Sequence, residues 1–498
     1  MNALWKTFFR KRVFGLCGGL ALMAVAGCTV GPDHVPPETS TSPAWHSDLK
    51  GGLTPGPLDP NTLAAWWTTL NDPQLSGLIE RAVAGNLDLK TAQSRIRESR
   101  ARREMAQGVG LPTLTATASA TSSQTDTNRG IDTRGESYSS RFDAGWELDL
   151  FGRIRRSVEA AQADLESVEE NLHDVLVSLL AETALNYIEV RTFQARLAAA
   201  EANLESQNET YQLTLWRAES GLDDEVAMHQ AKYNLESTRA QIPTLRTGRE
   251  EALNRLAVLL GETPGNLHKE LEKSEAIPVP PAEVAVGVPA DIMRQRPDIR
   301  RAERELAAQT ARVGVAMADL YPRLTFNGSI GLEFLSRREP SSSSRTGSIT
   351  GGPQVSWAIF DPTVRPNIEI QSALQEQAMI QYQAVVLSSF EEVENALVAY
   401  AQERQRRESL RLAMESAQVA ADLEQFKYQA GLSDFINVLV AQRSLLTFQD
   451  QYHQSNGTVT SDVIRLYKSL GGGWTSMAAP SAMSGSVEQN RDRETIHD

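Results

Sequence analysis

The sequence has few of the residue groupings that carry enzyme or metal chemistry. Its seven histidines are scattered, and those on predicted helices have no second ligand at metal-binding spacing. No phosphate-binding loop or nucleophile elbow is present, since the three glycines at 471–473 lack the strand-to-helix setting of either motif. The methionines are dispersed and give no indication of a copper relay. We therefore expect no catalytic centre, no metal site and no bound cofactor.

Positive charge is also in short supply. Lys and Arg total 49 against 63 Asp and Glu, so the formal net charge is −14. Because an acidic chain is repelled by phosphates, we expect no nucleic-acid partner.

The one long uncharged apolar run lies near the N-terminus. Basic residues through Arg12 precede an apolar run at 13–26, which is too short to span a membrane and is typical of a secretory signal. The run ends at Val25-Ala26-Gly27-Cys28, which resembles a bacterial lipobox. The resemblance implies that residues 1–27 are removed and that Cys28 receives a diacylglycerol group. An ordinary secretory signal with an incidental cysteine is the alternative.

Cysteine usage agrees with a lipid anchor. The sequence has only Cys17 and Cys28, and Cys17 would leave with the signal. The mature chain would then keep one cysteine, at its first position, and could form no internal disulfide. Thr29 follows, and the absence of Asp there is, by resemblance to enteric lipoproteins, compatible with sorting to the outer membrane. Covalent lipid on Cys28 is thus the only non-protein group that we expect.

The central feature of the sequence is a strand that leads into a very long helix. From Arg141 to Leu150 apolar and polar residues alternate, as in a strand with one apolar and one charged face. Phe151-Gly152 ends the strand, and apolar residues then recur at alternating spacings of four and three, the pattern of a coiled-coil seam. The seam comprises Ile154, Val158, Ala161, Leu165, Val168, Leu172, Val175 and Leu179. A helix continuing to Trp216 would be roughly 95 Å long at ~1.5 Å per residue, too long for an ordinary globular core.

These elements occur twice. Leu111-Pro112-Thr113-Leu114 matches Tyr321-Pro322-Arg323-Leu324 at an offset of 210 residues. The same offset superposes Asp88 on Asp298, Ala92 on Ala302, Arg155 on Arg365, Glu159 on Glu369, Glu182 on Glu392, Gly221 on Gly431, Leu235 on Leu445 and Gly261 on Gly471. One register over so long a stretch indicates an internal duplication. Each copy is predicted as helix, strand, loop, strand, long helix, short turn and long helix, which gives a mixed α and β fold.

The duplication defines the domain boundaries. We predict an extended tether at 28–60 and a disordered tail at 475–498. The first repeat, 61–264, has strands at about 113–121 and 138–150 and long helices at about 153–216 and 224–260. A linker at 265–288 leads to the second repeat, 289–474, with strands at about 323–335 and 348–360 and long helices at about 364–428 and 434–470. Pro353 lies within the last strand and predicts a bulge or kink there.

Four strands per chain imply an oligomer. Each run is close to the ~9–11 residues that a tilted strand needs to cross a bilayer. Four strands cannot close a barrel, and open sheet edges are not tolerated in hydrocarbon because their N–H and C=O groups stay unpaired. Two copies would give a barrel filled by side chains, and three would enclose a wider lumen.

Several motifs resemble the outer membrane factors of tripartite efflux systems, the TolC-like family, and within it the lipid-anchored OprM/NodT branch. The motifs are Cys28-x-Val30-Gly31-Pro32, Trp66-Trp67-x-x-Leu70-x-Asp72-Pro73-x-Leu75, Arg296-Pro297-Asp298-Ile299 with Ala302-Glu303, Phe360-Asp361, Gly431-Leu432-x-Asp434-Phe435-x-x-Val438-Leu439-x-Ala441-Gln442-Arg443 and Leu470-Gly471-Gly472-Gly473-Trp474. The resemblance implies a homotrimer in the outer membrane with a 12-stranded β-barrel, continued across the periplasm by a 12-helix α-barrel. Its partners would be a periplasmic adaptor and an inner-membrane pump of the RND type, for which it would be a passive exit duct.

The resemblance also implies site residues at the turns between the long helices. Relatives close their periplasmic end with a basic–aromatic pair, which here is Lys427-Tyr428, and with an apolar constriction, which here is Ile436. Where an acid often stands in relatives this chain has Val440, so an ion-pair lock at that position is in doubt. We expect packing to close the channel more than charge pairing does.

Four turn residues and two acids complete the predicted sites. Gly supplies the left-handed conformation that follows a helix C-terminus. The resemblance implies that adaptor helices dock beside the two turns, at Gly221, Leu222, Gly431 and Leu432. Asp434 and its repeat counterpart Asp224 come just after the turns and are predicted to form carboxylate rings that favour cations.

Two other functions fit the same architecture. One is the outer-membrane component of a type I-like secretion system, although the lipobox favours the efflux branch. The other is a non-conducting, structural coiled-coil lipoprotein, against which the four alternating strands argue.

Overall fold

The computed structural model describes residues 29–37, 42–57, 59–126, 132–222, 224–290, 295–337 and 342–474. The chain divides into two compact units, and each unit draws on both sequence repeats. The first unit comprises Met1–Glu38, Ser94–Glu169 and Arg301–Gln383, and the second comprises Thr39–Gln93, Glu170–Arg300 and Ala384–Asp498. The predicted signal, Cys28 and the predicted tail lie outside the described residues.

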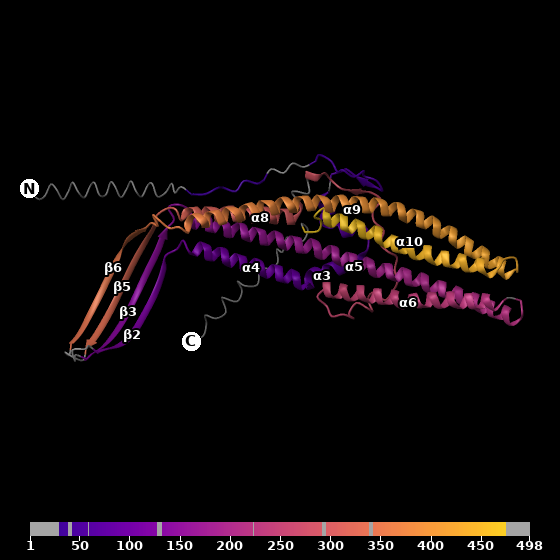
Figure 1. Ribbon diagram of the computed structural model, residues 1–498, viewed down its shortest axis with the longest axis horizontal. Helices are drawn as coiled ribbons and strands as arrows, with labels where there is room; N and C mark the ends of the chain where they lie inside the picture. The colour runs from indigo at the N-terminus through magenta and orange to yellow at the C-terminus, as the bar shows by residue number, and fades with distance from the viewer. Residues whose placement is uncertain are drawn as a thin grey trace, which may run out of the picture. The chain divides into compact units, whose positions relative to one another are not determined.

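A four-stranded antiparallel sheet dominates the first unit (Figure 1). Its strands are β2 (Thr113–Asp126), β3 (Asp132–Leu148), β5 (Arg323–Arg337) and β6 (Ser342–Ser356), in the order β2-β3-β5-β6. The central pair, β3 and β5, joins the two repeats in a continuous register, with Trp146 opposite Phe326 and Tyr138 opposite Phe334. The two central strands of the sheet therefore come from different repeats.

The strands differ in extent from the sequence-based prediction. β3 begins at Asp132 rather than near 138, and β6 begins at Ser342 rather than near 348. These added residues are mostly Ser, Thr, Gly and Arg, which carry no apolar alternation, but their backbones continue the ladder of the neighbouring strand. At the opposite ends β3 stops at Leu148 and β6 at Ser356, short of the predicted 150 and 360.

The bulge or kink predicted at Pro353 is wrong. Pro353 lies opposite Phe326 in an uninterrupted register that runs from Arg323–Ser356 to Arg337–Ser342. β6 is an edge strand of the sheet in this chain. Proline lacks one N–H, so it removes a single ladder hydrogen bond while the neighbouring residue pairs keep the register.

The sheet has two chemically different faces. Phe142, Ile330 and Ile349 lie in one row across three strands, and all three are at least half exposed. The residues beside them in the next row are Arg141, Gly331 and Ser348, on the other face. Apolar side chains thus cover one face, and polar and charged side chains cover the other.

Four helices contribute to the first unit. They are α4 (Leu87–Gly108) and α8 (Pro297–Ala318), each from about its second turn onward, and the opening turns of α5 (Arg153–Glu219) and α9 (Val364–Gln429). α5 has 67 residues and α9 has 66. Ala163 on α5 packs against Ala307 and Ala308 on α8, and small side chains there let the two helices approach closely.

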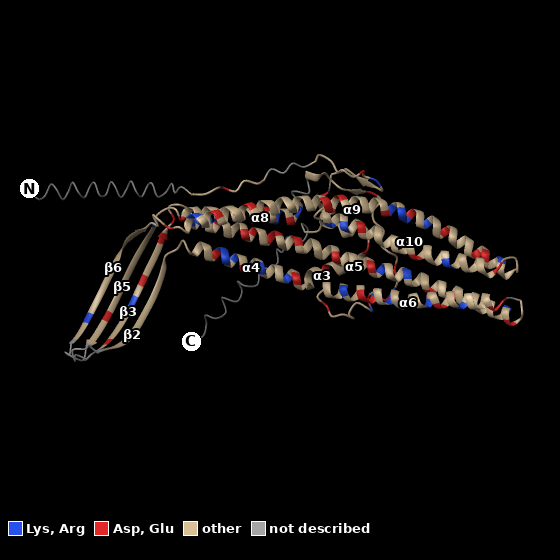
Figure 2. Ribbon diagram, in the orientation of Figure 1, with Lys and Arg blue, Asp and Glu red and all other residues tan. Residues whose placement is uncertain are grey.

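The second unit contains the rest of α5 and α9 with their partners α6 (Glu225–Leu259) and α10 (Phe435–Ser469) (Figure 1). It also holds α2 (Pro60–Ala64), η1 (Trp66–Leu70) and α3 (Pro73–Gly85). Trp66 is 1% exposed and stacks on Tyr467 of α10 at 5.7 Å between ring centroids. Charged residues are spread along all four long helices (Figure 2). None of the described helices is both long and apolar enough to cross a membrane.

The tether and linker predictions need correction in this unit. β1 (Leu53–Thr54), in the predicted tether, pairs in parallel with β4 (Val284–Ala285), in the predicted linker. Glu394 of α9 accepts hydrogen bonds from the His46 backbone N–H at 2.7 Å and from Ser47. Residues 42–57 are therefore packed against the helices. Two-residue strands are too short to show periodicity, so this pairing could not be predicted from the sequence.

The predicted seam of α5 is only partly buried. Ile154, Leu165 and Leu179 are buried, but the other five seam residues are half-buried. Neighbouring positions that the heptad omits are buried instead, among them Ala160, Ala163, Leu176, Val177 and Leu180. A helix that contacts more than one neighbour buries a wider stripe than a two-stranded coiled coil does.

Candidate functional site

Both turns between long helices have the same hydrogen-bonded form. Gly221 and Gly431 have φ of +67° and +73°. At the first turn the Leu222 N–H donates to the Arg217 carbonyl at 2.8 Å, and the Gly221 N–H donates to Ala218 at 3.0 Å. The second turn repeats this with Leu432 to Lys427 and Gly431 to Tyr428, at the same distances. Each glycine thus ends its helix in a Schellman motif, for which a left-handed residue is required.

The leucine after each glycine is exposed. Leu222 is 70% exposed and Leu432 is 76% exposed. Ile436 and Val440 are 46% and 57% exposed and lie four residues apart on one face of α10, and Leu432 precedes them in the turn. This apolar stripe is not covered by the described part of the chain.

The two predicted acids begin helices. Asp224 caps α6, and its carboxylate accepts from the Val226 N–H at 3.2 Å. Asp434 is the N-cap of α10 but makes no side-chain cap hydrogen bond. Both side chains are exposed, and a carboxylate at a helix N-terminus is favoured by the helix dipole.

Lys427 pairs within its own helix. Its Nζ lies 2.8 Å from Glu424 Oε1, and the other oxygen of Glu424 accepts from Ser433 Oγ at 2.7 Å. The hydrogen bond from Lys427 is the main cause that holds the pKa of Glu424 below its ordinary value. Lys427 therefore braces the turn between α9 and α10 through Glu424.

Tyr428, which the resemblance implies is part of the periplasmic closure, is buried in this chain. It is 2% exposed and lies in a cluster with Ala231, Phe435, Val438 and Leu439. Tyr211, Leu213 and Ala227 pack against this cluster, so it draws on all four long helices. We call it the tip cluster.

Further contacts fix the ring of Tyr428. It meets Phe435 edge-on at 5.6 Å, and the guanidinium of Arg217 lies 4.9 Å from its centroid. Tyr428 Oη lies 3.5 Å from the Thr214 hydroxyl of α5. The tyrosine therefore holds the hairpin of α9 and α10 against the hairpin of α5 and α6.

Beyond the tip cluster, contacts within a hairpin differ in chemistry from contacts between hairpins. Within the hairpins the contacts are apolar: Leu197, Ala200, Ile242 and Leu245 join α5 to α6, and Ala417, Ala421, Ala441 and Leu445 join α9 to α10. Between the hairpins α5 meets α10 through polar groups. Gln442 donates to Thr210 at 2.9 Å, and Asn203 donates to Gln449 at 2.5 Å.

A charged pair and an unpaired amide complete this polar seam. Arg196 reaches both carboxylate oxygens of Asp450, at 2.7 and 3.1 Å. Gln207 of α5 is 3% exposed, and neither polar atom of its side chain has a hydrogen-bond partner among the described residues. The neutral contacts contribute little net stability, and the Arg196–Asp450 pair is partly exposed to solvent, so the two hairpins are held together less firmly here than each hairpin is internally.

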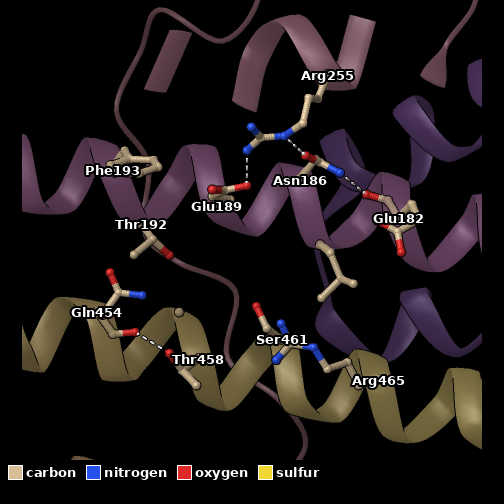
Figure 3. A pocket seen from close by; sticks show the side chains of 12 residues that line it. Glu182, Asn186, Glu189, Thr192, Phe193, Arg255, Gln454, Thr458, Ser461 and Arg465 are labelled. Atoms are coloured by element: carbon tan, nitrogen blue, oxygen red, sulfur yellow. Dashed lines mark hydrogen bonds and ion pairs between the residues drawn. The ribbon is translucent and has the colours of Figure 1, made fainter. Parts of the chain in front are cut away.

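A groove of about 660 Å³ lies over α5, between α6 and α10 (Figure 3). Arg255 of α6 bridges Asn186 at 2.9 Å and Glu189 at 2.5 Å across its wall. At Gly457, a Cβ would lie 2.0 Å from the Thr192 hydroxyl, so only glycine lets α10 approach α5 this closely. The charged groups lining the groove are at least two-fifths exposed, as on a solvated surface.

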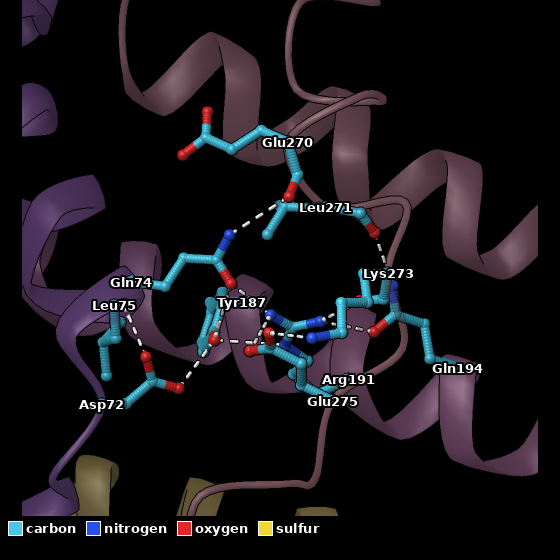
Figure 4. A network of polar contacts seen from close by, with 10 residues as sticks. All are labelled: Asp72, Gln74, Leu75, Tyr187, Arg191, Gln194, Glu270, Leu271, Lys273 and Glu275. Atoms are coloured by element: carbon cyan, nitrogen blue, oxygen red, sulfur yellow. Dashed lines mark hydrogen bonds and ion pairs between the residues drawn. The ribbon is translucent and has the colours of Figure 1, made fainter.

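A buried polar network fixes the linker between repeats (Figure 4). Arg191 of α5 is 1% exposed and donates to Tyr187 Oη at 3.1 Å, Gln194 at 2.8 Å and the Lys273 carbonyl at 2.9 Å. It also contacts Gln74 of α3 and Glu275 of the linker. Burial is the main cause that raises the pKa of Tyr187, so its hydroxyl stays protonated and donates to Asp72 at 2.6 Å.

Sequence reasoning did not predict this network. Its members lie far apart along the chain, from Asp72 to Glu275, and only the fold brings them together. The sequence feature that could have pointed to the network is Asp72-Pro73 in the motif Trp66–Leu75. Asp72 also caps α3 by accepting a hydrogen bond from the Leu75 N–H at 3.0 Å. Arg296 of another quoted motif has a similar role, since it contacts Asp298 at 2.7 Å, Glu392 at 2.8 Å and the Ser469 carbonyl at 2.8 Å.

The comparisons with known proteins agree with this architecture. The family model described as outer membrane efflux protein matches residues 78–262 and 288–472, one match per repeat. Nodulation protein T of Rhizobium leguminosarum bv. trifolii is 34% identical over 440 residues, covering 86% of this chain and 90% of that protein. The toluene efflux pump outer membrane protein TtgF of Pseudomonas putida is 26% identical, covering 92% and 96%. The solved outer-membrane channel OprN is 36% identical with a TM-score of 0.81, covering 90% of this chain and all of that one.

Proposed function

Because the chain belongs to the outer membrane efflux protein family, we propose that it is the outer-membrane exit duct of a tripartite efflux pump. In this role it is a homotrimer that conducts small molecules passively and performs no chemistry of its own. The observation that carries the proposal is the four-stranded sheet with one apolar face, one polar face and two unpaired edges.

The sheet edges are the argument for a closed trimer. Among the described residues β2 and β6 each have one strand neighbour, so the outer edge of each presents a row of backbone N–H and C=O groups to which no other described strand is paired. Such rows are not tolerated in lipid, so β2 of one copy must pair with β6 of the next. Three copies give a 12-stranded barrel with an apolar outside and a lumen lined by the polar face. Native mass spectrometry in detergent should give three chains, and a stable monomer or dimer would refute the closed barrel.

The partners follow from the chain's relatives. TtgF is named as the outer membrane protein of a toluene efflux pump, and this chain matches nearly its whole length. We infer that this chain works with a periplasmic adaptor and an inner-membrane pump of the RND type. Cys28 would carry the lipid that adds to membrane attachment, since one acyl group alone anchors weakly.

The turns between the long helices are the proposed adaptor surface. Gly221 and Gly431 shape the turns, and Leu222 and Leu432 present apolar side chains to solvent. The exposed stripe of Leu432, Ile436 and Val440 extends that surface along α10. An apolar helix of the adaptor would gain from covering these side chains.

The tip cluster is the proposed closing device of the duct. Tyr428 joins the two hairpins by packing, while Lys427 makes its ion pair within α9. Opening would separate the hairpins along the polar seam, where contacts exchange with water at low cost. Asp224 and Asp434, exposed at the same end of the hairpins, would favour cations at the entrance.

A further inference from the structure

The N-terminal segment of the first unit is docked, although its composition predicts a tether. The Val30 N–H donates to the Phe151 carbonyl at 3.1 Å, just after β3 ends. Thr29 lies against Gly152, where a Cβ would approach the Thr29 methyl carbon to 2.6 Å. The segment therefore begins at the junction between β3 and α5.

One buried arginine holds this segment. Arg156 of α5 has a side chain only 3% exposed, and it donates to the carbonyls of Val30 and Gly31, both at 3.1 Å. It also contacts the carboxylates of Asp33 at 2.7 Å and Glu159 at 2.8 Å. Four acceptors on one guanidinium fix the backbone of residues 30–33 against α5, because the planar fork sets the direction of each hydrogen bond.

Two glycines allow the segment to pack closely between α5 and α8. Gly31 has φ of +95°, and a Cβ there would lie 2.4 Å from the Cα of Gly314 on α8. A Cβ on Gly314 would in turn press on the Arg156 side chain at 3.0 Å. The segment fits between α5 and α8 only with glycine at both positions.

The docking place has the chemistry of a membrane interface. Trp146 at the end of β3 donates its indole N–H to the Gly110 carbonyl at 2.9 Å, and Trp357 after β6 donates to Leu320 at 3.0 Å. Phe151 stacks on Tyr321 at 4.8 Å. Half-exposed tryptophans with hydrogen-bonded indoles are typical of the boundary between lipid and water.

We propose that Arg156 is a positioning residue that fixes where the N-terminal lipid enters the membrane. Residues 30–33, which Arg156 holds, lie near the aromatic ends of the strands, so a lipid attached before Thr29 would enter the leaflet at that boundary. The proposal rests on the proposed function for the lipid on Cys28. The clamp itself is a property of one chain and does not depend on conduction or on the trimer.

The test measures a distance distribution between two spin labels in the first unit. Val35→Cys and Val109→Cys supply the labelling sites, since these side chains are 75% and 52% exposed and lipid blocks the thiol of Cys28. The pair is measured in the lipidated protein and in its Cys28→Ser form, which also carries Cys17→Ser so that a retained signal adds no third thiol. We expect one narrow distribution in both forms, and a distribution at least twice as wide when Arg156→Met is added to the Cys28→Ser form.

Controls separate the clamp from general damage. Arg153→Met removes another arginine of the same turn, which contacts Glu147 of β3 at 2.8 Å, and should leave the distribution narrow. Arg156→Lys keeps the positive charge but lacks the planar guanidinium. Its distance distribution should therefore be narrower than that of Arg156→Met but wider than that of the native arginine. If Arg156→Met fails to fold, Gly31→Ala replaces it, because the added Cβ would clash with Gly314 of α8 and displace the segment. Conductance should be unchanged in every folded variant.

Three results would overturn the proposal. A broad distribution in the lipidated protein would show a free tether. A narrow one that Arg156→Met and Gly31→Ala leave unchanged would show that other contacts hold the segment. A distribution that is narrow only with lipid present would show that the membrane, rather than Arg156, positions it.

Discussion

Replacing Tyr428 with alanine would remove the largest side chain of the tip cluster. The ring is 2% exposed and touches groups from both hairpins, including Phe435 and Arg217. Truncating a buried aromatic residue to alanine costs about 3–5 kcal/mol, through lost transfer energy and the cavity left behind. If half of that cost falls on the closed arrangement alone, the ratio of closed to open channels falls roughly 10- to 70-fold, at ~1.4 kcal/mol per factor of ten.

The neighbouring lysine supplies the matched comparison. Lys427 is 40% exposed and pairs with Glu424 three residues earlier, so its loss removes a solvent-screened surface ion pair that contributes little net stability. This predicts at most about a twofold change in open probability. Ile436→Ala should have an intermediate effect, because its side chain is 46% exposed. Tyr428→Phe keeps the ring and should behave nearly as the native protein does.

The assay is single-channel recording of the four variants in planar bilayers, with circular dichroism to check that each is folded. Tyr428→Ala should raise the time-averaged conductance most, followed by Ile436→Ala. If Lys427→Ala opened the channel most, charge pairing rather than packing would hold it shut, and the reasoning from the tip cluster would be wrong.

Three further predictions concern the anchor, the buried network and the entrance. Cys28→Ser should abolish lipid labelling but leave the protein in the outer-membrane fraction, since closed strands supply most of the membrane affinity; complete loss from that fraction would reverse the ranking of the two anchors. Arg191→Met should destabilise the folded chain by about 3–5 kcal/mol, because it leaves buried partners unpaired, whereas Arg255→Met at an exposed pair should cost less than ~1 kcal/mol; equal denaturation midpoints would contradict this. Asp224→Asn combined with Asp434→Asn should reduce cation selectivity, and an unchanged reversal potential under a salt gradient would place the selectivity elsewhere.

Periodicity predicted the elements with the strongest patterns. The alternation around Trp146 placed β3, and the paired glycines at 221 and 431 placed both turns, because each signal is local. The extra length of β3 and β6 was missed, since Ser- and Gly-rich segments have no alternation and extend only because a neighbouring strand pairs with them. The bulge or kink predicted at Pro353 was wrong for a related reason, because the register there is set by pairing with β5, which the local sequence does not show.

Tyr428 was assigned to the gate by resemblance alone. The structure adds that Ala417, Ala421 and Tyr428, spaced by four and seven residues, lie on one buried face of α9. Counting the heptad from Ala417 would have found this. Arg156 and Arg191 could not be assigned from the sequence, because the partners that bury them come from segments more than 80 residues away.

The most direct test of the account is the conductance of the purified full-length protein in a planar bilayer under a salt gradient. A closed trimeric duct with exposed carboxylates at its entrance predicts discrete conductance steps, small in the native protein, with a reversal potential that shows cation preference. A protein that inserts stably into the bilayer and shows no conductance steps, in the native form and in Tyr428→Ala alike, would contradict the exit duct.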